Sequence, residues 1–284
     1  MGNGIAHVFA QSGFNVELFD ISEGALEKAV ATIAKNMDRQ IAKEKMTEGD
    51  KQASLDRLNT GTDLAKAVGN ADLVVEAATE NREIKFKLFQ DLDKYAPAHC
   101  ILSSNTSSIS ITKIAAQTKR ADKVIGMHFM NPVPVMKLVE IIRGYSTSDE
   151  TMDAVVEMSK ALGKVPVDCN DYPGFVANRI LMPMINEAII SLHEGVAGVQ
   201  EIDTIMKLGM AHPMGPLQLA DFIGLDVCLS IMNVLYEGLG NPKYAPCPLL
   251  VNMVTAGKLG VKSGEGFYDY SEGPKNAVVS TQFK

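Results

Sequence analysis

Hydrophobic and polar positions follow different spacings in the two parts of this chain, and the first part alternates between strand-like and helix-like segments. Short apolar runs bounded by polar or turn residues predict strands. Longer stretches with apolar residues at helical spacing separate most of these runs. The predicted strands are Asn15–Phe19, Ala71–Ala77, His99–Ser103, Lys123–Met127, Leu138–Ile142 and Val165–Cys169. Such alternation builds a mainly parallel sheet that helices cover on both faces.

The helices of the first part follow from the same spacing and from capping residues. Ser22 can cap a long helix that runs to about Lys45. A second helix, from Glu48 to Leu58, completes a helical hairpin over residues 23–58 that is inserted in the sheet domain. The other predicted helices are Met1–Ser12, Arg82–Tyr95, Ile111–Gln117 and Glu150–Leu162.

After Cys169 the pattern changes to one helix after another. From Phe175 onward, glycine and proline punctuate the helical stretches, and no strand is convincing. We therefore predict an N-terminal α/β domain over residues 1–171 and an all-α C-terminal domain over residues 172–284. The last dozen residues are expected to form a loose tail.

The start of the chain is typical of the second half of a dinucleotide-binding motif. That motif joins a strand to a helix through a glycine-rich turn, and an acidic residue follows about 20 positions later. Gly2 and Asp20 have this separation, which predicts a Rossmann-type first domain. The Asp20 charge would repel a 2′-phosphate, which favours NAD over NADP. Taken alone, a glycine near a helix start is also ordinary helix geometry.

Composition and charge narrow the classes of function. A chain of 284 residues that is 46% hydrophobic can bury a substantial core. The net charge of -7 argues against a general nucleic-acid surface. No apolar run approaches the roughly 20 residues that span a bilayer, so we expect no membrane span and a cytoplasmic protein. The cysteines lack metal-ligand or redox spacing, so we expect reduced thiols and no metal site: Cys100, Cys169, Cys228 and Cys247.

Two residues in neighbouring predicted strands are candidates for acid–base chemistry. His128 follows an apolar strand, where ligand sites of open α/β sheets collect, and histidine exchanges protons near neutrality. From its position alone, His128 fits a half-buried structural histidine equally well. Glu140 lies among apolar neighbours, where a charge is costly unless it is paired. If Glu140 pairs with an imidazole, it fixes the ring's tautomer. If it is instead an exposed residue on an edge strand, it has no catalytic role.

Taken together, eight segments resemble one enzyme family far more specifically than the glycine pattern does. They are MGNGIAHVFAQSGFNVELFD, VVEAATEN, SSNTSSISI, GMHFMNPVPVMKLVEII, ALGKVPV, PGFVANRILMPMINEA, MKLGMAHPMGPLQLADFIGLD and SGEGFYDY. The chain resembles the short-chain L-3-hydroxyacyl-CoA dehydrogenase family. The resemblance implies NAD-dependent interconversion of (S)-3-hydroxyacyl-CoA and 3-oxoacyl-CoA, with 3-hydroxybutyryl-CoA expected as substrate. It also implies a homodimer that forms through the helical domain.

The resemblance also exposes a departure at the start of the chain. Family members begin with a strand and the pattern G-x-G-x-M-G, whose methionine and last glycine correspond to Met1 and Gly2. About a dozen residues of the pattern have no counterpart here. We therefore expect a gap in the sheet and weakened cofactor binding.

Finally, the resemblance implies roles for individual residues. Catalysis is expected of His128, Glu140, Ser107 and Asn178. Cofactor contacts are expected of Gly2, Asp20, Glu80, Lys85, Asn105, Ser107 and Asn131. Acyl-CoA contacts are expected of Ser107, Asn178, Lys43 and Lys45, although the two lysines also fit a solvated face. Two other interpretations stay open: a different two-domain NAD-dependent hydroxy-acid dehydrogenase, and an inactive dimeric scaffold that binds acyl-CoA.

Overall fold

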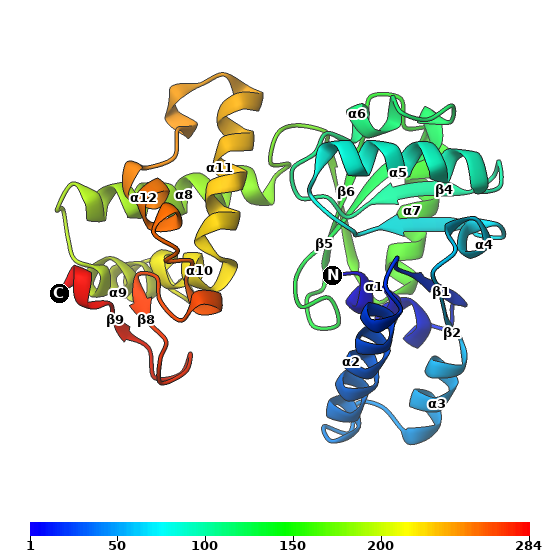
Figure 1. The fold of residues 1–284 in the computed structure, drawn as a ribbon, viewed down its shortest axis with the longest axis horizontal. Coiled ribbons are helices and arrows are strands. Elements are labelled where there is room, and N and C mark those ends of the chain that lie inside the picture. Colours follow the sequence, from blue (N-terminus) through cyan, green and yellow to red (C-terminus); the bar gives the residue numbers. More distant parts are fainter. The chain divides into compact units, whose positions relative to one another are not determined.

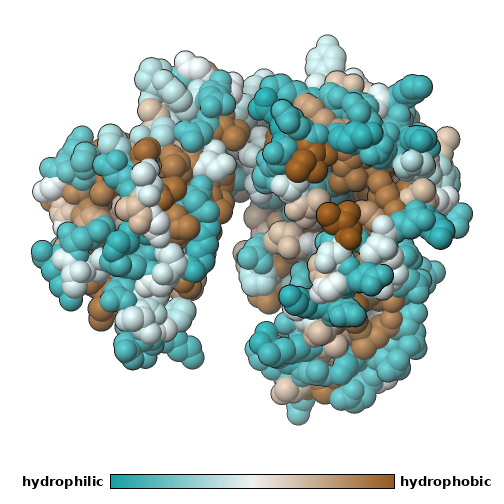
Figure 2. Space-filling view, viewed as in Figure 1, coloured by the Kyte–Doolittle hydropathy of each residue, from teal (hydrophilic) through white to brown (hydrophobic).

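The computed structural model describes all 284 residues, which divide into two compact units (Figure 1). The N-terminal unit is Met1–Tyr172 and the C-terminal unit is Pro173–Lys284, one residue after the expected boundary. Both units have a largely hydrophilic surface that smaller apolar patches interrupt (Figure 2). No single helix has the length and apolar composition to cross a membrane. The adjoining helices Pro216–Ile223 and Leu225–Leu239 meet that test only as a pair, which is bent by 98°.

Seven strands lie in the N-terminal unit. Five of them form one sheet in the order β3-β4-β5-β6-β7, and β1 and β2 form a separate parallel pair. Within the larger sheet, only β5 and β6 run antiparallel to each other. The strands are β1 Val16–Phe19, β2 Leu58–Gly61, β3 Leu73–Glu76, β4 Ile101–Ser104, β5 Val124–Phe129, β6 Leu138–Arg143 and β7 Val165–Asn170. The predicted mainly parallel sheet is confirmed.

The sheet is interrupted between β1 and β3. β1 is hydrogen-bonded only to β2, and β3 only to β4, so no ladder joins the two sheets. Val16 of β1 and Val75 of β3 nevertheless pack against the same apolar cluster as α1, which spans Gly2–Gln11. The expected gap is therefore present, and apolar side chains under α1 connect the two sheets.

Helices cover both faces of the larger sheet (Figure 1). On one face, Val8 of α1 and Val155 of α7 belong to the same cluster as Met127 of β5. On the other face, a Cβ added to Gly126 would lie 3.0 Å from Ile111 of α6. The helices outside the hairpin are α1, α4 Leu64–Val68, α5 Arg82–Tyr95, α6 Ile111–Ala115, α7 Asp149–Ala161 and the single-turn η1 Ala121–Lys123.

The helical hairpin consists of α2 Glu23–Ile41 and α3 Glu48–Asp56, and it differs from the prediction at two ends. α2 stops at Ile41 because Glu44 adopts a left-handed conformation, with φ 56°, and the Lys45 N–H returns to the Gln40 carbonyl. Lys43 and Lys45 therefore lie in a turn. Leu58 begins β2, a strand that the sequence pattern did not predict, because LNTG has no alternating apolar positions and takes its extended form from pairing with β1.

The C-terminal unit is a helical domain around its own core. Ile189, Leu217, Leu235 and Leu250 are all fully buried in one cluster. Its elements are α8 Ala177–His193, α9 Val199–Gly209, α10 Pro216–Ile223, α11 Leu225–Leu239, α12 Pro248–Thr255, β8 Tyr268–Asp269, β9 Val278–Val279 and the single turns η2 Pro242–Tyr244, η3 Val261–Ser263 and η4 Thr281–Phe283. Apart from its two very short strands, the unit is helical as predicted.

The expectation of a loose C-terminal tail is wrong. Residues 278–279 pair with 268–269 in a small antiparallel ladder. Ser280 is fully buried, and its hydroxyl donates to Glu265 at 2.7 Å. The Phe283 ring lies 5.7 Å from the Phe267 ring. Ring packing and one buried hydroxyl therefore hold this segment in place, although its composition did not predict that it would be ordered.

Candidate active site

His128 lies near the end of β5 and faces the side of the sheet that carries α6. Successive side chains of a strand point to opposite faces. Met127 and Phe129 belong to the α1–α7 cluster, so His128 points to the other face, where it is 7% exposed. Glu140 of β6 lies directly opposite in the antiparallel ladder and is 3% exposed. The register of two neighbouring strands therefore pairs the two predicted residues.

The contact with Glu140 determines which imidazole nitrogen carries the proton. Glu140 Oε2 lies 2.7 Å from His128 Nδ1. An ionised carboxylate only accepts hydrogen bonds, so Nδ1 is the donor in this contact. In the neutral ring, Nε2 is then an acceptor and is ready to take a proton.

Ser107 brings a hydroxyl to the second imidazole nitrogen. It lies in the loop between β4 and α6, and its Oγ is 2.9 Å from His128 Nε2. With the proton on Nδ1, the serine hydroxyl donates to the neutral ring, and it accepts from the protonated ring. Ser107, His128 and Glu140 therefore form one hydrogen-bonded line. All three were predicted catalytic residues, and the fold brings them together.

A serine, a histidine and a carboxylate in line also occur in enzymes of acyl transfer. Those enzymes need backbone N–H groups that are aimed at a developing oxyanion. Here the Ser107 N–H bonds Glu80 at 2.6 Å, and the N–H groups of Ser108 and Ile109 bond the Thr106 hydroxyl at 3.2 and 2.9 Å. The turn thus has no N–H group to spare for an oxyanion, and proton transfer at the histidine is the chemistry that fits.

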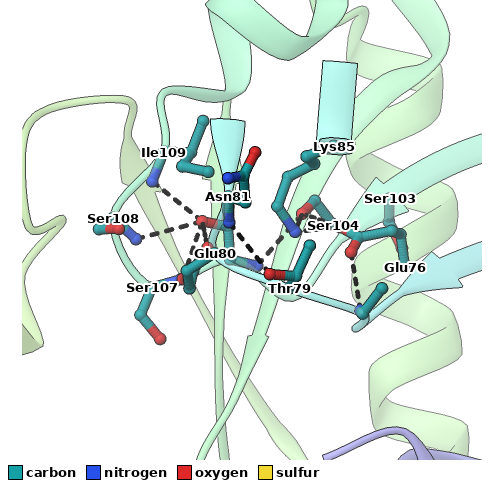
Figure 3. Close-up of polar contacts among 12 residues, drawn as sticks. Glu76, Thr79, Glu80, Asn81, Lys85, Ser103, Ser104, Ser107, Ser108 and Ile109 are labelled. Atoms are coloured by element: carbon teal, nitrogen blue, oxygen red, sulfur yellow. Dashed lines mark hydrogen bonds and ion pairs between the residues drawn. The ribbon is translucent and has the colours of Figure 1, made fainter. Parts of the chain in front are cut away.

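Lys85 is buried, and its ammonium group contacts Glu76 and Ser104 (Figure 3). The residue is 2% exposed, and Nζ lies 2.5 Å from Glu76 and 3.5 Å from the Ser104 hydroxyl. Glu76 also accepts the Ser104 hydroxyl at 2.7 Å and the Ala78 N–H at 2.8 Å. The Lys85 ammonium neutralises Glu76, and its expected contact with the cofactor stays a prediction. A carboxylate buried at the end of an apolar strand needs such a counter-charge.

Glu80, in contrast, reaches the loop that carries Ser107 (Figure 3). It accepts the Ser107 N–H and the hydroxyl of Thr106, which is 1% exposed. Neither Thr106 nor Glu76 was among the predicted site residues. The acidic residue within the apolar run ADLVVEA was the signal that could have identified Glu76.

Asn105 and Asn131 follow the ends of neighbouring strands. The Asn105 side-chain oxygen accepts the Phe129 N–H at 2.8 Å, which ties the end of β4 to the end of β5. Asn131 is exposed, and its peptide bond to Pro132 is cis. The carboxyl ends of parallel strands are where ligands of open α/β sheets bind. Both residues remain predicted cofactor contacts at this edge.

The N-terminus of α1 and the end of β1 lie at one edge, because a turn at residues 12–15 reverses the chain between them. Asp20 follows β1 directly, and one of its oxygens accepts the Ser22 N–H at 3.0 Å. A Cβ added to Gly2 would meet nothing within 4 Å. A helix N-terminus suits a pyrophosphate, and a carboxylate suits ribose hydroxyls. These residues therefore fit a dinucleotide.

Gly4 and Lys164 secure the loop between β5 and β6, although the sequence analysis assigned neither a role. A Cβ added to Gly4 would lie 3.0 Å from the Val133 side chain, so a larger residue would push α1 away from this loop. The Lys164 ammonium donates to the carbonyls of Val133 and Met136 at 2.5 and 2.8 Å. The loop that carries Asn131 is therefore held from two sides.

The remaining predicted substrate contacts lie in other elements. Lys43 and Lys45 are exposed in the turn between α2 and α3. Lys45 lines a surface cavity of about 360 Å³ together with the end of α1. Asn178 lies in α8 of the C-terminal unit and is 9% exposed. The roles of these three residues stay predictions.

The cysteines are all free thiols. Burial raises the pKa of Cys100 to about 11 and the pKa values of Cys169 and Cys228 to about 12. The reactive form of a thiol is the thiolate, so these three side chains are poor nucleophiles at neutral pH. They take no part in the chemistry of the site.

Both units of the chain are similar to known proteins. The family model described as "3-hydroxyacyl-CoA dehydrogenase, NAD binding domain" matches residues 1–172, and "3-hydroxyacyl-CoA dehydrogenase, C-terminal domain" matches residues 174–270. "Probable 3-hydroxybutyryl-CoA dehydrogenase" of Bacillus subtilis is 54% identical over 272 residues, which cover 96% of this chain and 94% of the relative. "Hydroxyacyl-coenzyme A dehydrogenase, mitochondrial" of Homo sapiens is 47% identical over 277 residues, which cover 95% and 88%.

A solved structure shows the same similarity. The crystal structure of an (S)-3-hydroxybutyryl-CoA dehydrogenase from Ralstonia eutropha aligns with a TM-score of 0.93 at 55% identity, and the alignment covers 95% of each chain. A Rossmann-type domain followed by a helical domain, with a histidine and a carboxylate paired at the sheet edge, defines a two-domain NAD-dependent dehydrogenase. More specifically, the chain belongs to the 3-hydroxyacyl-CoA dehydrogenase family. It is an NAD-dependent oxidoreductase that interconverts 3-hydroxyacyl-CoA and 3-oxoacyl-CoA, which excludes the alternative hydroxy-acid dehydrogenase.

Proposed function

We propose that the chain interconverts (S)-3-hydroxybutyryl-CoA and acetoacetyl-CoA, with His128 as the general base and acid. The observation that carries this proposal is the line formed by Ser107, His128 and Glu140, with contacts of 2.9 and 2.7 Å. The four-carbon acyl chain is supported by the relatives from Bacillus subtilis and Ralstonia eutropha, which are named for 3-hydroxybutyryl-CoA.

In the oxidation direction, His128 Nε2 takes the proton of the 3-hydroxyl group while the hydrogen on the same carbon leaves as hydride. NAD, when bound, supplies the hydride acceptor. Glu140 holds the ring with Nδ1 protonated and stabilises the positive charge that develops on it. In the reverse direction the protonated ring returns the proton to the oxygen of the ketone. Ser107 and Asn178 are proposed to hydrogen-bond the reacting oxygen.

The NAD contacts are proposed for residues at the carboxyl edge of the sheet. Gly2 lies at the N-terminus of α1, and Asp20 offers a carboxylate for the adenosine ribose. The Asp20 charge disfavours NADP, whose 2′-phosphate it would repel. Further contacts to the cofactor are proposed for Glu80, Lys85, Asn105, Ser107 and Asn131.

For the rest of the substrate, we propose that Lys43 or Lys45 pairs with a phosphate of CoA. Both ammonium groups are exposed in the α2–α3 turn, so they can reach a flexible anionic ligand.

A homodimer is proposed to form through the C-terminal unit. α9 and the residue after it expose three large apolar side chains: Ile205 by 59%, Leu208 by 81% and Met210 by 60%. Burial against a second copy of the same helix would remove these side chains from water. Sedimentation of the wild-type chain and of Leu208→Glu would test this, and a monomeric wild type would refute it.

The central test measures loss of NADH absorbance with acetoacetyl-CoA, for the wild-type chain and for His128→Gln. The chain should also be measured with an apolar strand and the G-x-G motif of the family added before Met1. Turnover by the wild type that His128→Gln abolishes supports the assignment. Turnover only after the addition supports the assignment and shows that the gap between β1 and β3 must be filled. No turnover by either chain, with acyl-CoA still bound, would favour the scaffold.

A further inference from the structure

The turn that carries Ser107 is organised around the hydroxyl of its neighbour, Thr106. This hydroxyl donates to Glu80 Oε2 at 2.8 Å and accepts the N–H groups of Ser108 at 3.2 Å and Ile109 at 2.9 Å. A threonine hydroxyl has one proton to donate and two lone pairs. Its whole hydrogen-bonding capacity is therefore used within the turn.

Glu80 also holds the turn, through both of its carboxylate oxygens (Figure 3). While one of its oxygens takes the Thr106 hydroxyl, the other accepts the Ser107 N–H at 2.6 Å. The backbone N–H of Ser107 and the two that follow it are thus all held. The Ser107 hydroxyl, in consequence, is presented 2.9 Å from His128 Nε2.

The loop that carries Glu80 is itself anchored at both ends. At its start, Glu76 accepts the Ala78 N–H at 2.8 Å, and the buried Lys85 ammonium holds Glu76 in place. At its end, Asn81 caps α5 by accepting the Ile84 N–H at 3.0 Å. The position of Glu80 is therefore set by the sheet and by α5 together, so its carboxylate is a fixed support for the turn.

We propose that Thr106 and Glu80 are positioning residues that place the Ser107 hydroxyl beside His128, where it can hydrogen-bond the reacting oxygen of the substrate. The inference rests on the proposed function, because it assumes that Ser107 contacts that oxygen. Neither residue transfers a proton, and both act through Ser107. Misplacement of a reacting group by about 1 Å can cost about 100-fold in rate. Loss of the Thr106 hydroxyl therefore lowers kcat far more than it changes KM.

The test compares Thr106→Val, which keeps the shape and removes the hydroxyl, with Thr106→Ser, which keeps the hydroxyl. We expect kcat to fall about 10- to 100-fold in the valine variant, with KM for acetoacetyl-CoA and NADH within about threefold of wild type. The serine variant should recover most of the loss. Thr118→Val is the matched control, because its hydroxyl bonds only locally, to Ala115 O at 2.9 Å and Arg120 N at 3.4 Å, and its kcat should not change. Wild-type kcat in Thr106→Val, or equal losses in both Thr106 variants, would overturn the proposal.

A second readout does not depend on turnover. Amide hydrogen exchange of Ser108 and Ile109 should accelerate in Thr106→Val and stay slow in Thr106→Ser, because only the valine removes their acceptor. If neither the wild type nor the chain extended before Met1 reduces acetoacetyl-CoA, the proposed function fails, while the exchange measurement still tests the turn. Unchanged exchange in Thr106→Val would refute the positioning role in either case.

Discussion

Replacement of Glu140 by glutamine removes one charge from the site and keeps the shape of the side chain. The carboxylate lies 2.7 Å from His128 Nδ1, and the two residues are 3% and 7% exposed. Unit charges about 4 Å apart interact by about 4 kcal/mol at an effective dielectric constant of about 20. The amide oxygen can still accept from Nδ1, so we assign about 3–4 kcal/mol to the lost stabilisation of the protonated ring in the transition state. That corresponds to a fall in kcat of about 10²- to 10³-fold.

The assay is steady-state reduction of acetoacetyl-CoA by NADH, with kcat and KM determined separately. KM should stay within about threefold of wild type, since Glu140 is not expected to touch the substrate. Glu157→Gln is the control, because Glu157 is exposed and pairs only with Lys160 on the same helix. Melting temperatures of both variants show whether the fold is intact. A folded Glu140→Gln enzyme with kcat within threefold of wild type would show that the buried charge does not assist the histidine.

Three further predictions concern the cofactor edge and the C-terminal unit. Asp20→Ala should shift the ratio of KM values for NADH and NADPH roughly tenfold towards NADPH, and an unchanged ratio would remove Asp20 from the ribose site. Gly4→Ala should destabilise the fold by about 1–3 kcal/mol in thermal unfolding, since its Cβ would lie 3.0 Å from Val133, and wild-type stability would contradict the tight approach. Burial raises the pKa of Asp221 to about 6, despite hydrogen bonds from the Phe267 and Tyr268 N–H groups and the Tyr270 hydroxyl. A folded-state pKa above the unfolded value of 3.8 means that this group contributes most stability below pH 4 and loses it, by about 3 kcal/mol, as the pH rises through 6. The stability of wild type relative to Asp221→Asn should therefore be greater at pH 4.5 than at pH 7, and a constant difference would contradict the shift.

Strands were predictable here where apolar residues form a short run, both in β5, which is buried throughout, and in β7, which is largely exposed. Six of the seven strands of the N-terminal unit, including the run KVIGM before His128, coincide with predicted segments. The missed strands are short and owe their extended form to a partner: β2 pairs with β1, and β9 pairs with β8. A local pattern cannot reveal a strand whose apolar content is too small to stand out.

The candidate site was predictable in its residue types and not in its contacts. His128 and Glu140 stood out because a histidine followed an apolar strand and a carboxylate interrupted another, and the antiparallel register then joined them. The partner of Lys85 was not predictable, and its expected contact with the cofactor stays a prediction. Its ammonium bonds Glu76, a carboxylate that lies nine positions earlier on another element.

The sequence by itself determined the alternation of strands and helices, the change to an all-helical second part, and His128 and Glu140 as candidates for acid–base chemistry. These features depend on apolar periodicity and on the cost of burying a charge, and both act within a few neighbouring residues. Only the tertiary structure decided that Ser107 meets His128, 21 positions away, and that Thr106 and Glu80, 26 positions apart, hold it there. Those contacts arise because sheet register and helix caps bring distant loops to one edge, where each buried polar group takes the partner that lies within reach.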